Sequence, residues 1–291
     1  MSAYVLWGLF PLYWPLLEPA GAVEILGHRV IWSLLFLAGL LAVVHRWPAL
    51  RALGRQPGAV LRLAVAAVVI AVNWGLYIWA VNSGQVVETS LGYFINPLVT
   101  VLLGVALLGE RLRRLQWWAV SLGAIAVLVL AVEYGRPPWI ALALAVTFAT
   151  YGFLKKRVNA GAVETLSVET AVLLVPAIGY VVALEASGGG AFDRSVGHSV
   201  LLATTGLVTA IPLICFGAAA TRLPLSDIGL LQYLAPVLQF LVGVLVRHEP
   251  MPPGRLAGFA LVWCALAVLT VDVLRGSPPV MLPGRGQVST Q

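Results

Sequence analysis

Long apolar runs dominate this sequence and leave few ways for it to fold. Ten such runs are separated by short stretches that carry charges, glycine or proline. A helix needs about 20 residues to cross the hydrocarbon core of a bilayer, and the runs approach that length. We therefore predict an all-α integral membrane protein with ten transmembrane helices. The predicted spans are residues 2–17, 24–44, 60–82, 87–108, 115–132, 139–154, 164–184, 199–221, 226–246 and 254–274.

The scarcity of charged residues excludes an ordinary soluble globule. Only 10% of the residues are charged and 60% are hydrophobic, whereas a soluble domain carries about 25% charged residues. Ten spans in a chain of 291 residues leave no room for a large soluble domain, which argues against extramembrane catalysis. No Lys or Arg precedes Arg29, so we predict that the first run is a membrane helix and not a signal peptide.

Several kinds of site and partner are not expected. No basic run is longer than Lys155-Lys156-Arg157, so the net charge of +6 does not predict nucleic-acid binding. Cys215 and Cys264 lie inside apolar runs, and the four histidines form no cluster with them, so neither a disulfide framework nor a metal site is predicted. No phosphate-binding loop of the P-loop type is present, which argues against ATP as the energy source. We predict no cofactor.

The distribution of positive residues predicts the orientation. With the amino terminus in the cytoplasm, 13 of the 18 Lys and Arg residues fall on the cytoplasmic side, four fall on the other side and Arg29 lies within a span. Cytoplasmic loops of membrane proteins carry an excess of Lys and Arg. Both termini are therefore predicted to be cytoplasmic.

An internal duplication divides the chain into halves. Gly21-Ala22-Val23-Glu24 recurs as Gly161-Ala162-Val163-Glu164 at an offset of 140, and matches at an offset of 139 continue the pattern. We predict two five-helix repeats, 1–135 and 136–275, followed by a disordered cytoplasmic tail at 276–291. Because five is odd, the second repeat enters the membrane from the opposite side, an architecture that supports alternating access. The further matches are Ala80 with Ala219, Glu88 with Asp227, Leu91 with Leu230, Pro97 with Pro236, Gly104 with Gly243 and Glu110 with Glu249.

Polar side chains recur on one face of several predicted spans. They follow a helical spacing in the run 87–108, and some of them correspond to polar residues of the run 226–246 at the offset of 139. Such residues line a wet cavity or form hydrogen bonds between helices; we favour the cavity. Aromatic side chains beside them suit a largely apolar ligand pocket. The candidate cavity residues are Asn73, Trp74, Tyr77, Tyr93, Asn96, Thr100, Gln232, Tyr233 and Gln239.

The candidates for a charge pair or for energy coupling are His28, Arg29, Glu88 and Glu169. The offset of 140 carries Arg29 onto Glu169, which leads to the hypothesis that the two form an ion pair across the repeat interface, with His28 nearby. The alternative is that Arg29 reaches the membrane interface while Glu169 is solvated separately. Glu88 lies in the first turn of its helix, where capping and proton binding are both open.

Five segments carry recognisable motifs. They are EILGHRVIWS (24–33), the segment 73–82 with NW at its start and WAVN at its end, ETSLGYFINPL (88–98), AAATRL (218–223) and Gln232-Tyr233. Together they resemble RarD-type permeases, in the EamA branch of the drug/metabolite transporter superfamily, and the resemblance runs over nearly the whole chain. It implies ten helices in two EamA repeats and a multi-pass protein of the bacterial inner membrane.

The leading functional hypothesis is a secondary transporter that exports small organic metabolites or amphipathic drugs by alternating access, driven by the proton motive force. Its expected partners are a small-molecule substrate, the lipid bilayer and protons as the coupling ion; the sequence predicts no oligomeric state. A passive channel is the main alternative. A lipid-modifying membrane enzyme is less favoured, because its ionisable residues would cluster at one interface, whereas those of this chain are scattered.

Overall fold

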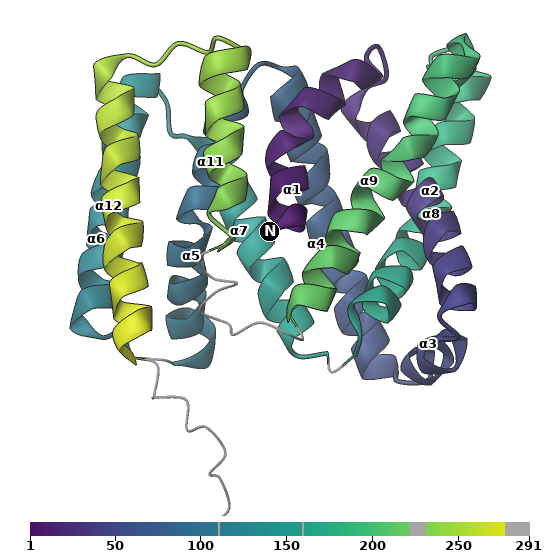
Figure 1. Cartoon of the computed structure of the whole chain (residues 1–291), viewed down its shortest axis with the longest axis horizontal. Coiled ribbons are helices and arrows are strands. Elements are labelled where there is room, and N and C mark those ends of the chain that lie inside the picture. The colour runs from purple at the N-terminus through teal and green to yellow at the C-terminus, as the bar shows by residue number, and fades with distance from the viewer. Residues whose placement is uncertain (110, 159, 221–230, 277–291) are drawn as a thin grey trace, which may run out of the picture.

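The computed structural model describes residues 1–109, 111–158, 160–220 and 231–276, and its regular structure within those ranges is entirely helical. The long helices run between two ends of the molecule, with the short helix α3 lying across one of them (Figure 1). The elements are α1 (Ser2–Tyr13), which continues as the 3-10 turn η1 (Trp14–Leu17), α2 (Ala22–Val43), α3 (Trp47–Gly54), α4 (Pro57–Asn82), α5 (Val86–Leu108), α6 (Arg114–Tyr134), α7 (Trp139–Lys156), α8 (Ala162–Ala186), the 3-10 turn η2 (Phe192–Arg194), α9 (Val196–Ala220), α11 (Leu234–Leu241), which continues as the π-helical turn η3 (Val242–Val246), and α12 (Pro253–Gly276).

Seven of the described helices are long and apolar enough to cross a membrane: α2, α4, α5, α6, α8, α9 and α12. The shorter α1, α7 and α11 occupy the positions of three further predicted spans. The all-α fold and the apolar helices support the predicted integral membrane protein, while the count of ten transmembrane helices stays a prediction. Residues 226–230 of the predicted span 226–246 lie outside the described ranges. So do residues 277–291, which are the predicted tail 276–291 without its first residue.

Local sequence explains where several helices begin and end. Gly21 adopts an extended conformation directly before α2, and Pro57 opens α4, where its missing N–H needs no partner within the helix. Gly109 follows α5 with φ of 66°, a left-handed conformation that a residue with a Cβ adopts only at a cost. Glycine and proline therefore mark the limits of these apolar helices.

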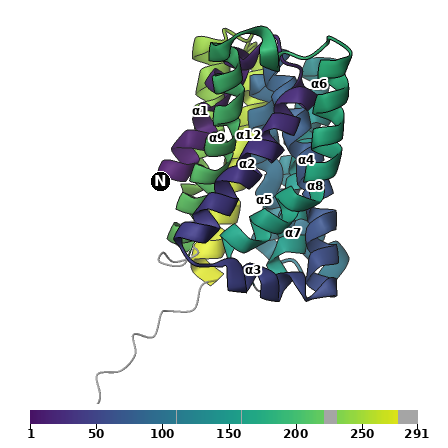
Figure 2. The same cartoon turned by 90° about the vertical axis from the view of Figure 1, so that its right-hand side faces the viewer.

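The helices place the loops at two ends, which we name the α3 end and the far end. α4, α6 and α8 begin at the α3 end, where α12 finishes, whereas α2, α5, α7 and α9 begin at the far end (Figures 1 and 2). The turn η2 also lies at the far end. The loop 45–59 and the end of α12 thus lie on the same side, as the sequence predicts, and the sequence did not predict that this loop contains α3.

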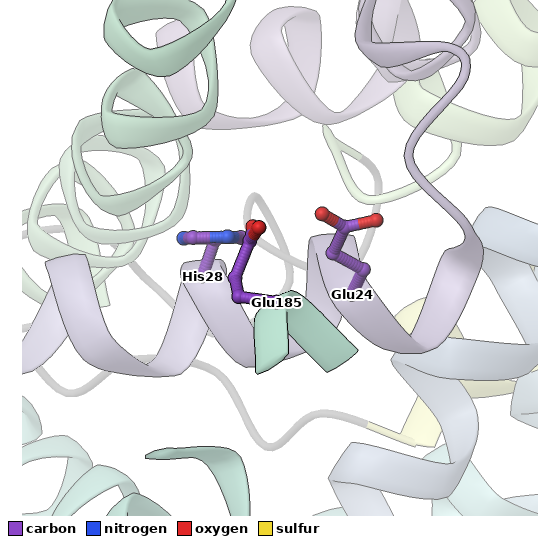
Figure 3. Close-up of side chains that lie close together, drawn as sticks. All are labelled: Glu24, His28 and Glu185. Atoms are coloured by element: carbon purple, nitrogen blue, oxygen red, sulfur yellow. The ribbon is translucent and has the colours of Figure 1, made fainter. Parts of the chain in front are cut away.

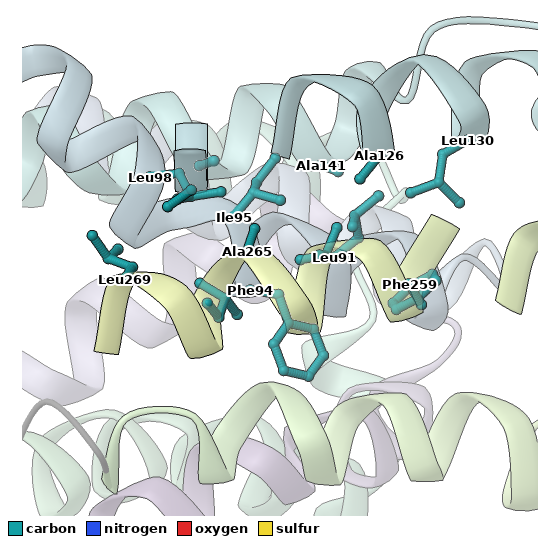
Figure 4. Packing of buried hydrophobic residues seen from close by; sticks show 14 of the residues in the cluster. Leu91, Phe94, Ile95, Leu98, Ala126, Leu130, Ala141, Phe259, Ala265 and Leu269 are labelled. Atoms are coloured by element: carbon teal, nitrogen blue, oxygen red, sulfur yellow. The ribbon is translucent and has the colours of Figure 1, made fainter. Parts of the chain in front are cut away.

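Two hydrophobic clusters hold the bundle together. The larger joins α5, α6, α7 and α12, with Leu91, Leu130 and Phe259 fully buried (Figure 4). The second contains Trp14 of η1 together with buried residues of α2, α4, α7 and α9. The outer faces are apolar as well, since Val132 and Val175 are more than three-quarters exposed. An apolar exterior of this kind fits a protein that is solvated by lipid.

Contacts between helices pair elements that are distant in sequence. α2 packs on α8 and α9, α4 on α7 and α8, α5 on α7 and α11, and α12 on α6, while α1 packs on α9 and α11. The two predicted repeats can be compared by replacing each helix with its counterpart, namely α1 with α7, α2 with α8, α4 with α9, α5 with α11 and α6 with α12. Most of the pairs then become other pairs that also pack together: α2–α9 becomes α8–α4, and α5–α7 becomes α11–α1.

Candidate functional site

A cavity of about 310 Å³ lies in the middle of the bundle. Its walls come from α1, α2, α4, α5, α7, α8, α9 and α11 together with the segment just before α11, so both predicted halves contribute. Aromatic rings make up much of the lining. The described lining residues are Tyr4, Trp7, Phe10, Arg29, Ile70, Trp74, Tyr77, Tyr93, Asn96, Phe148, Tyr151, Lys155, Ala162, Leu166, Leu213, Phe216, Gln232, Ala235, Pro236 and Gln239.

Six of the nine predicted cavity residues line this cavity in the structure: Trp74, Tyr77, Tyr93, Asn96, Gln232 and Gln239. The other three do not. Thr100 is exposed, and its hydroxyl donates to the carbonyl of Asn96 one turn earlier. Tyr233 packs against the larger hydrophobic cluster. These two placements correct the prediction, because helical spacing identifies a face but not what that face meets.

Asn73 is the third exception, and it acts as a support. Its side-chain amide is fully buried and donates to the carbonyl of Leu144 at 3.0 Å and to the Thr147 hydroxyl at 2.8 Å. Its carbonyl oxygen accepts a 3.3 Å hydrogen bond from the hydroxyl of Tyr93. Asn73 therefore ties α4 to α7 and orients Tyr93 at the cavity wall.

Two side-chain amides join the cavity wall to helices of the other predicted half. Asn96 of α5 donates to the carbonyl of Ala145 in α7 at 3.0 Å. Gln239 of α11 donates to the carbonyl of Trp7 in α1 at 3.2 Å. These bonds connect the helix at the fourth predicted span of each repeat, α5 or α11, to the helix at the first predicted span of the other. Asn96 and Gln239 therefore combine both predicted roles, cavity lining and interhelical hydrogen bonding.

Arg29 lies in the cavity wall with 3% of its surface exposed. Its Nε atom donates to the Thr209 hydroxyl of α9 at 2.6 Å. The guanidinium carbon lies 3.8 Å from the ring centre of Trp74 and 5.3 Å from that of Trp14. Arg29 forms no ion pair within the described part of the chain.

The predicted pair between Arg29 and Glu169 is wrong for this structure. Glu169 instead pairs with Lys155 at 3.1 Å and accepts a hydrogen bond from the Tyr151 hydroxyl at 3.1 Å. The reason lies in the inverted directions of α2 and α8, which start at opposite ends of the molecule. Arg29 and Glu169 each lie about 10 Å along their helix from its start, so the repeat equivalence places them at opposite depths.

Polar contacts tie the far end together. Glu88, which is 2% exposed, pairs with Arg136 at 2.7 Å and accepts a bond from the Ile140 amide at the start of α7. Glu249, in the loop before α12, accepts bonds from the amides of Val86 and Val87 at the start of α5. Burial raises the pKa of Glu249 above its ordinary value, while these two amide bonds act in the opposite direction.

A second group of titratable residues lies at the far end. Glu24 and His28 are one turn apart on α2, and Glu185 reaches them from the end of α8 (Figure 3). One ligand atom from each lies within 4.8 Å of the others. His28 Nε2 is buried without a hydrogen-bond partner among the described residues. Two carboxylates and an imidazole are a donor set that suits a divalent cation or a shared proton.

Sequence reasoning identified His28 but missed this group. Glu24 and His28 share a helical face at a spacing of four, which was a visible signal. Glu185 joins them only because α8 packs on α2, and the turn after α8 brings the Ala191 amide within 2.6 Å of Glu24. No spacing in the sequence could have indicated that third member.

Comparison with known proteins places these features in context. Residues 1–132 match the model of the EamA-like transporter family. The chain is similar to "Protein RarD" of Streptomyces exfoliatus, at 61% identity covering 94% of this chain and 87% of that protein. It is 43% identical to "Uncharacterized transporter YojE" of Bacillus subtilis (94% and 92% covered) and 43% identical to "Protein RarD" of Escherichia coli (94% and 93% covered).

A solved structure titled "Crystal structure of protein" resembles the chain in fold. The TM-score is 0.60 at 20% sequence identity, with 94% of this chain and 96% of that chain covered. The likeness extends over nearly the whole length of both chains, so the fold described above is shared from end to end.

Proposed function

The chain belongs to the EamA-like transporter family, in its RarD-type branch, and we propose that it is a secondary transporter that exports small organic solutes by alternating access. The observation that carries this proposal is the central cavity, which is enclosed by helices of both halves and lined by aromatic rings with a few polar groups. Ligand sites are commonly of this kind. The proposal names small metabolites and amphipathic drugs as the class of solute.

We further propose that residues 1–135 and 136–275 are inverted repeats and that all ten apolar helices cross the membrane. The exchange of α2–α9 with α8–α4 and of α5–α7 with α11–α1 supports this symmetry. In transporters of this architecture the site lies near the bilayer midplane, and one repeat rocks against the other around it. The excess of Lys and Arg at the α3 end supports a cytoplasmic location for that end and for both termini.

The reach of the cavity toward one end supports an inward-facing state, and ion pairs occur at both ends, since Arg46 pairs with Glu164 and Arg113 with Asp272 at the α3 end. The cavity lining reaches Lys155 and Ala162, in the last turn of α7 and the first of α8, which lie toward the α3 end. At the far end, Glu88 with Arg136 and Glu249 with the start of α5 hold the helices together. A solute would therefore enter from the α3 end, and the far-end contacts would open for its release.

Proton coupling is proposed to use the group formed by Glu24, His28 and Glu185. No lysine or arginine pairs with either carboxylate within the described residues. His198 of α9 also acts on His28, and η2, whose Phe192 stacks on the His28 ring, carries Asp193 and Arg194. α4, which also packs on α2, has its one charged residue, Arg62, in its second turn at the α3 end. A proton bound here reduces the repulsion between the carboxylates, and the group joins α2 to α8 where the far end would open.

Replacing His28 by glutamine is expected to uncouple transport from the pH gradient. A thermal-shift screen first identifies a solute that binds, because a ligand of the folded state raises its apparent stability. The protein is then reconstituted in liposomes, and accumulation of that solute is measured with and without an imposed pH gradient. The wild type should accumulate the solute only with the gradient, whereas His28→Gln should still exchange labelled for unlabelled solute without accumulating it.

His45→Gln is the matched control, because His45 is exposed in the turn between α2 and α3. Gradient-driven accumulation by His28→Gln at the wild-type level would remove this group from the coupling mechanism. Binding without flux of any solute through the wild type would contradict the transporter itself.

A further inference from the structure

The buried Arg29 has hydrogen-bonding capacity that the described part of the protein does not use. Its Nε atom bonds the Thr209 hydroxyl, but no bond from either terminal nitrogen to a described residue accompanies it. The terminal nitrogens are also not among the fully buried side-chain atoms that lack a partner, so they keep some exposed surface. Arg29 lines the cavity, and that exposed surface faces it. Arginine retains its charge under all ordinary conditions, so a cation and several N–H donors are directed at this space.

No acidic residue in the described part of the cavity wall balances that charge. Its described lining includes two cations, Arg29 and Lys155, and no carboxylate. Lys155 is already neutralised by Glu169, which accepts from it behind the wall. No residue in the described ranges therefore compensates the positive charge of Arg29 at membrane depth, where an isolated charge is costly and usually marks a functional site.

An aromatic ring covers one face of the Arg29 guanidinium, while the edge that carries the two terminal nitrogens meets no described partner. The Trp74 ring lies 3.8 Å from the guanidinium carbon, a cation–π contact that holds the plane in position. The Thr209 hydroxyl, on the helix α9 that packs on α2, fixes the Nε edge. A guanidinium held in this way can offer its terminal nitrogens as a fork, the geometry that binds a carboxylate through two parallel hydrogen bonds.

The rest of the cavity wall indicates which chemical groups the remainder of such a ligand would carry. Tyr77 and Tyr93 pack edge to face with ring centres 5.6 Å apart, and Phe148 packs against Tyr93 at 5.7 Å. Asn96 and Gln239 add polar groups, although their amide nitrogens already bond to backbone carbonyls. The wall therefore accepts a planar or apolar body and offers one strong site for charge.

We propose that Arg29 anchors the carboxylate of the transported solute, and that the substrates are small organic anions with an aromatic or otherwise apolar body. The inference rests on the proposed transport function and narrows its substrate class. Neutral and cationic drugs of the same size would fill the same volume but leave Arg29 uncompensated. Lys155, closer to the α3 end, would meet the anion first on its way in.

The test compares ligands that differ in charge but not in shape. The purified full-length protein is titrated at pH 7 with benzoate, 3-phenylpropanoate and indole-3-acetate, and with the amide of each acid, by calorimetry and thermal shift. At least one acid should bind roughly tenfold more tightly than its amide, the difference expected when a charge-assisted pair is lost. If no acid binds more tightly than its amide, the proposal is overturned.

Variants assign the preference to Arg29. Arg29→Gln should bring the ratio of acid to amide affinity close to one, while Arg29→Lys, which keeps the charge without the fork, should retain part of it. Arg51→Gln is the matched control, because Arg51 is an exposed arginine of α3 that does not line the cavity, and it should leave the acid preference at the wild-type level. An unchanged acid preference in a folded Arg29→Gln protein would contradict the proposal, and if that variant does not fold, a wild-type preference unchanged in Arg29→Lys would do the same.

The experiment separates this inference from the transport function. Binding is an equilibrium property that needs no flux, so an acid that binds through Arg29 but does not cross proteoliposomes would contradict transport and leave the anion site standing. Flux of the amides at the rate of the acids would contradict the anion site and leave transport standing.

Discussion

Replacing Arg136 by methionine is expected to destabilise the folded protein by about 3 kcal/mol. The change leaves Glu88 as a charge that is 2% exposed, with the Ile140 amide as its remaining described donor. Removing one partner of a buried ion pair costs about 3–5 kcal/mol, because the other charge stays buried without compensation. We expect the lower end of that range because the Arg136 side chain is 38% exposed.

A double-mutant cycle identifies the cause of the loss. In Glu88→Gln/Arg136→Met the neutral amide still accepts from Ile140 but carries no charge, so the double variant should be more stable than Arg136→Met alone. Arg194→Met is the control: Arg194 is exposed at the same end and forms no ion pair within the described residues, so its loss should change stability by less than about 0.5 kcal/mol. The measurement is denaturant unfolding in detergent micelles. Additive effects of the two single changes would show that the pair does not stabilise the far end.

Replacing Gly206 by alanine is expected to force α2 and α9 apart and to destabilise the protein by about 2–3 kcal/mol. A Cβ atom at Gly206 would lie 2.5 Å from the carbonyl carbon of Trp32 and 2.6 Å from its oxygen. These are backbone atoms of a neighbouring helix, so no side-chain rotation can relieve the clash. Small residues permit this kind of close approach between membrane helices.

Gly179→Ala is the matched control, because Gly179 lies inside another long helix, α8, and nothing lies within 4 Å of its added Cβ. That change should be neutral or slightly stabilising, since alanine favours the helix over glycine. Thr209 lies one turn from Gly206, so the alanine variant should also weaken the acid preference assigned to Arg29. Equal melting temperatures for the two alanine variants would contradict the close α2–α9 contact.

Much of the fold follows from the sequence because membrane helices are local objects. Apolar runs bounded by Gly21, Pro57 and Gly109 predict helix limits, since each residue acts on its own stretch of backbone. The face that carries Tyr93 and Asn96 was also predictable, because helical spacing is fixed. Both residues line the cavity in the structure.

The contacts made by charges were harder to predict because they depend on depth and on neighbours. Symmetry relates Arg29 to Glu169 but says nothing about their distance, and inversion moves them toward opposite ends. The pair that forms, Lys155 with Glu169, joins the adjoining ends of α7 and α8 and spans 14 positions. A search for opposite charges across the short turn between these helices would have found it. The prediction for Asn73 also depended on its neighbours. Its amide donates to the carbonyl of Leu144 in α7, and this contact keeps it out of the cavity lining.

The central claim, alternating access, is tested most directly by labelling one position from both membrane faces. Tyr93→Cys is introduced after the native Cys215 and Cys264 have been replaced, and an impermeant thiol reagent is applied to right-side-out and inside-out vesicles. Labelling should occur from both faces and should be faster from the α3 end. Adding Glu249→Ala, which frees the start of α5 at the far end, should raise the far-end rate and lower the α3-end rate. Two rates that rise together would indicate a channel, and labelling from one face only under every condition would contradict alternating access.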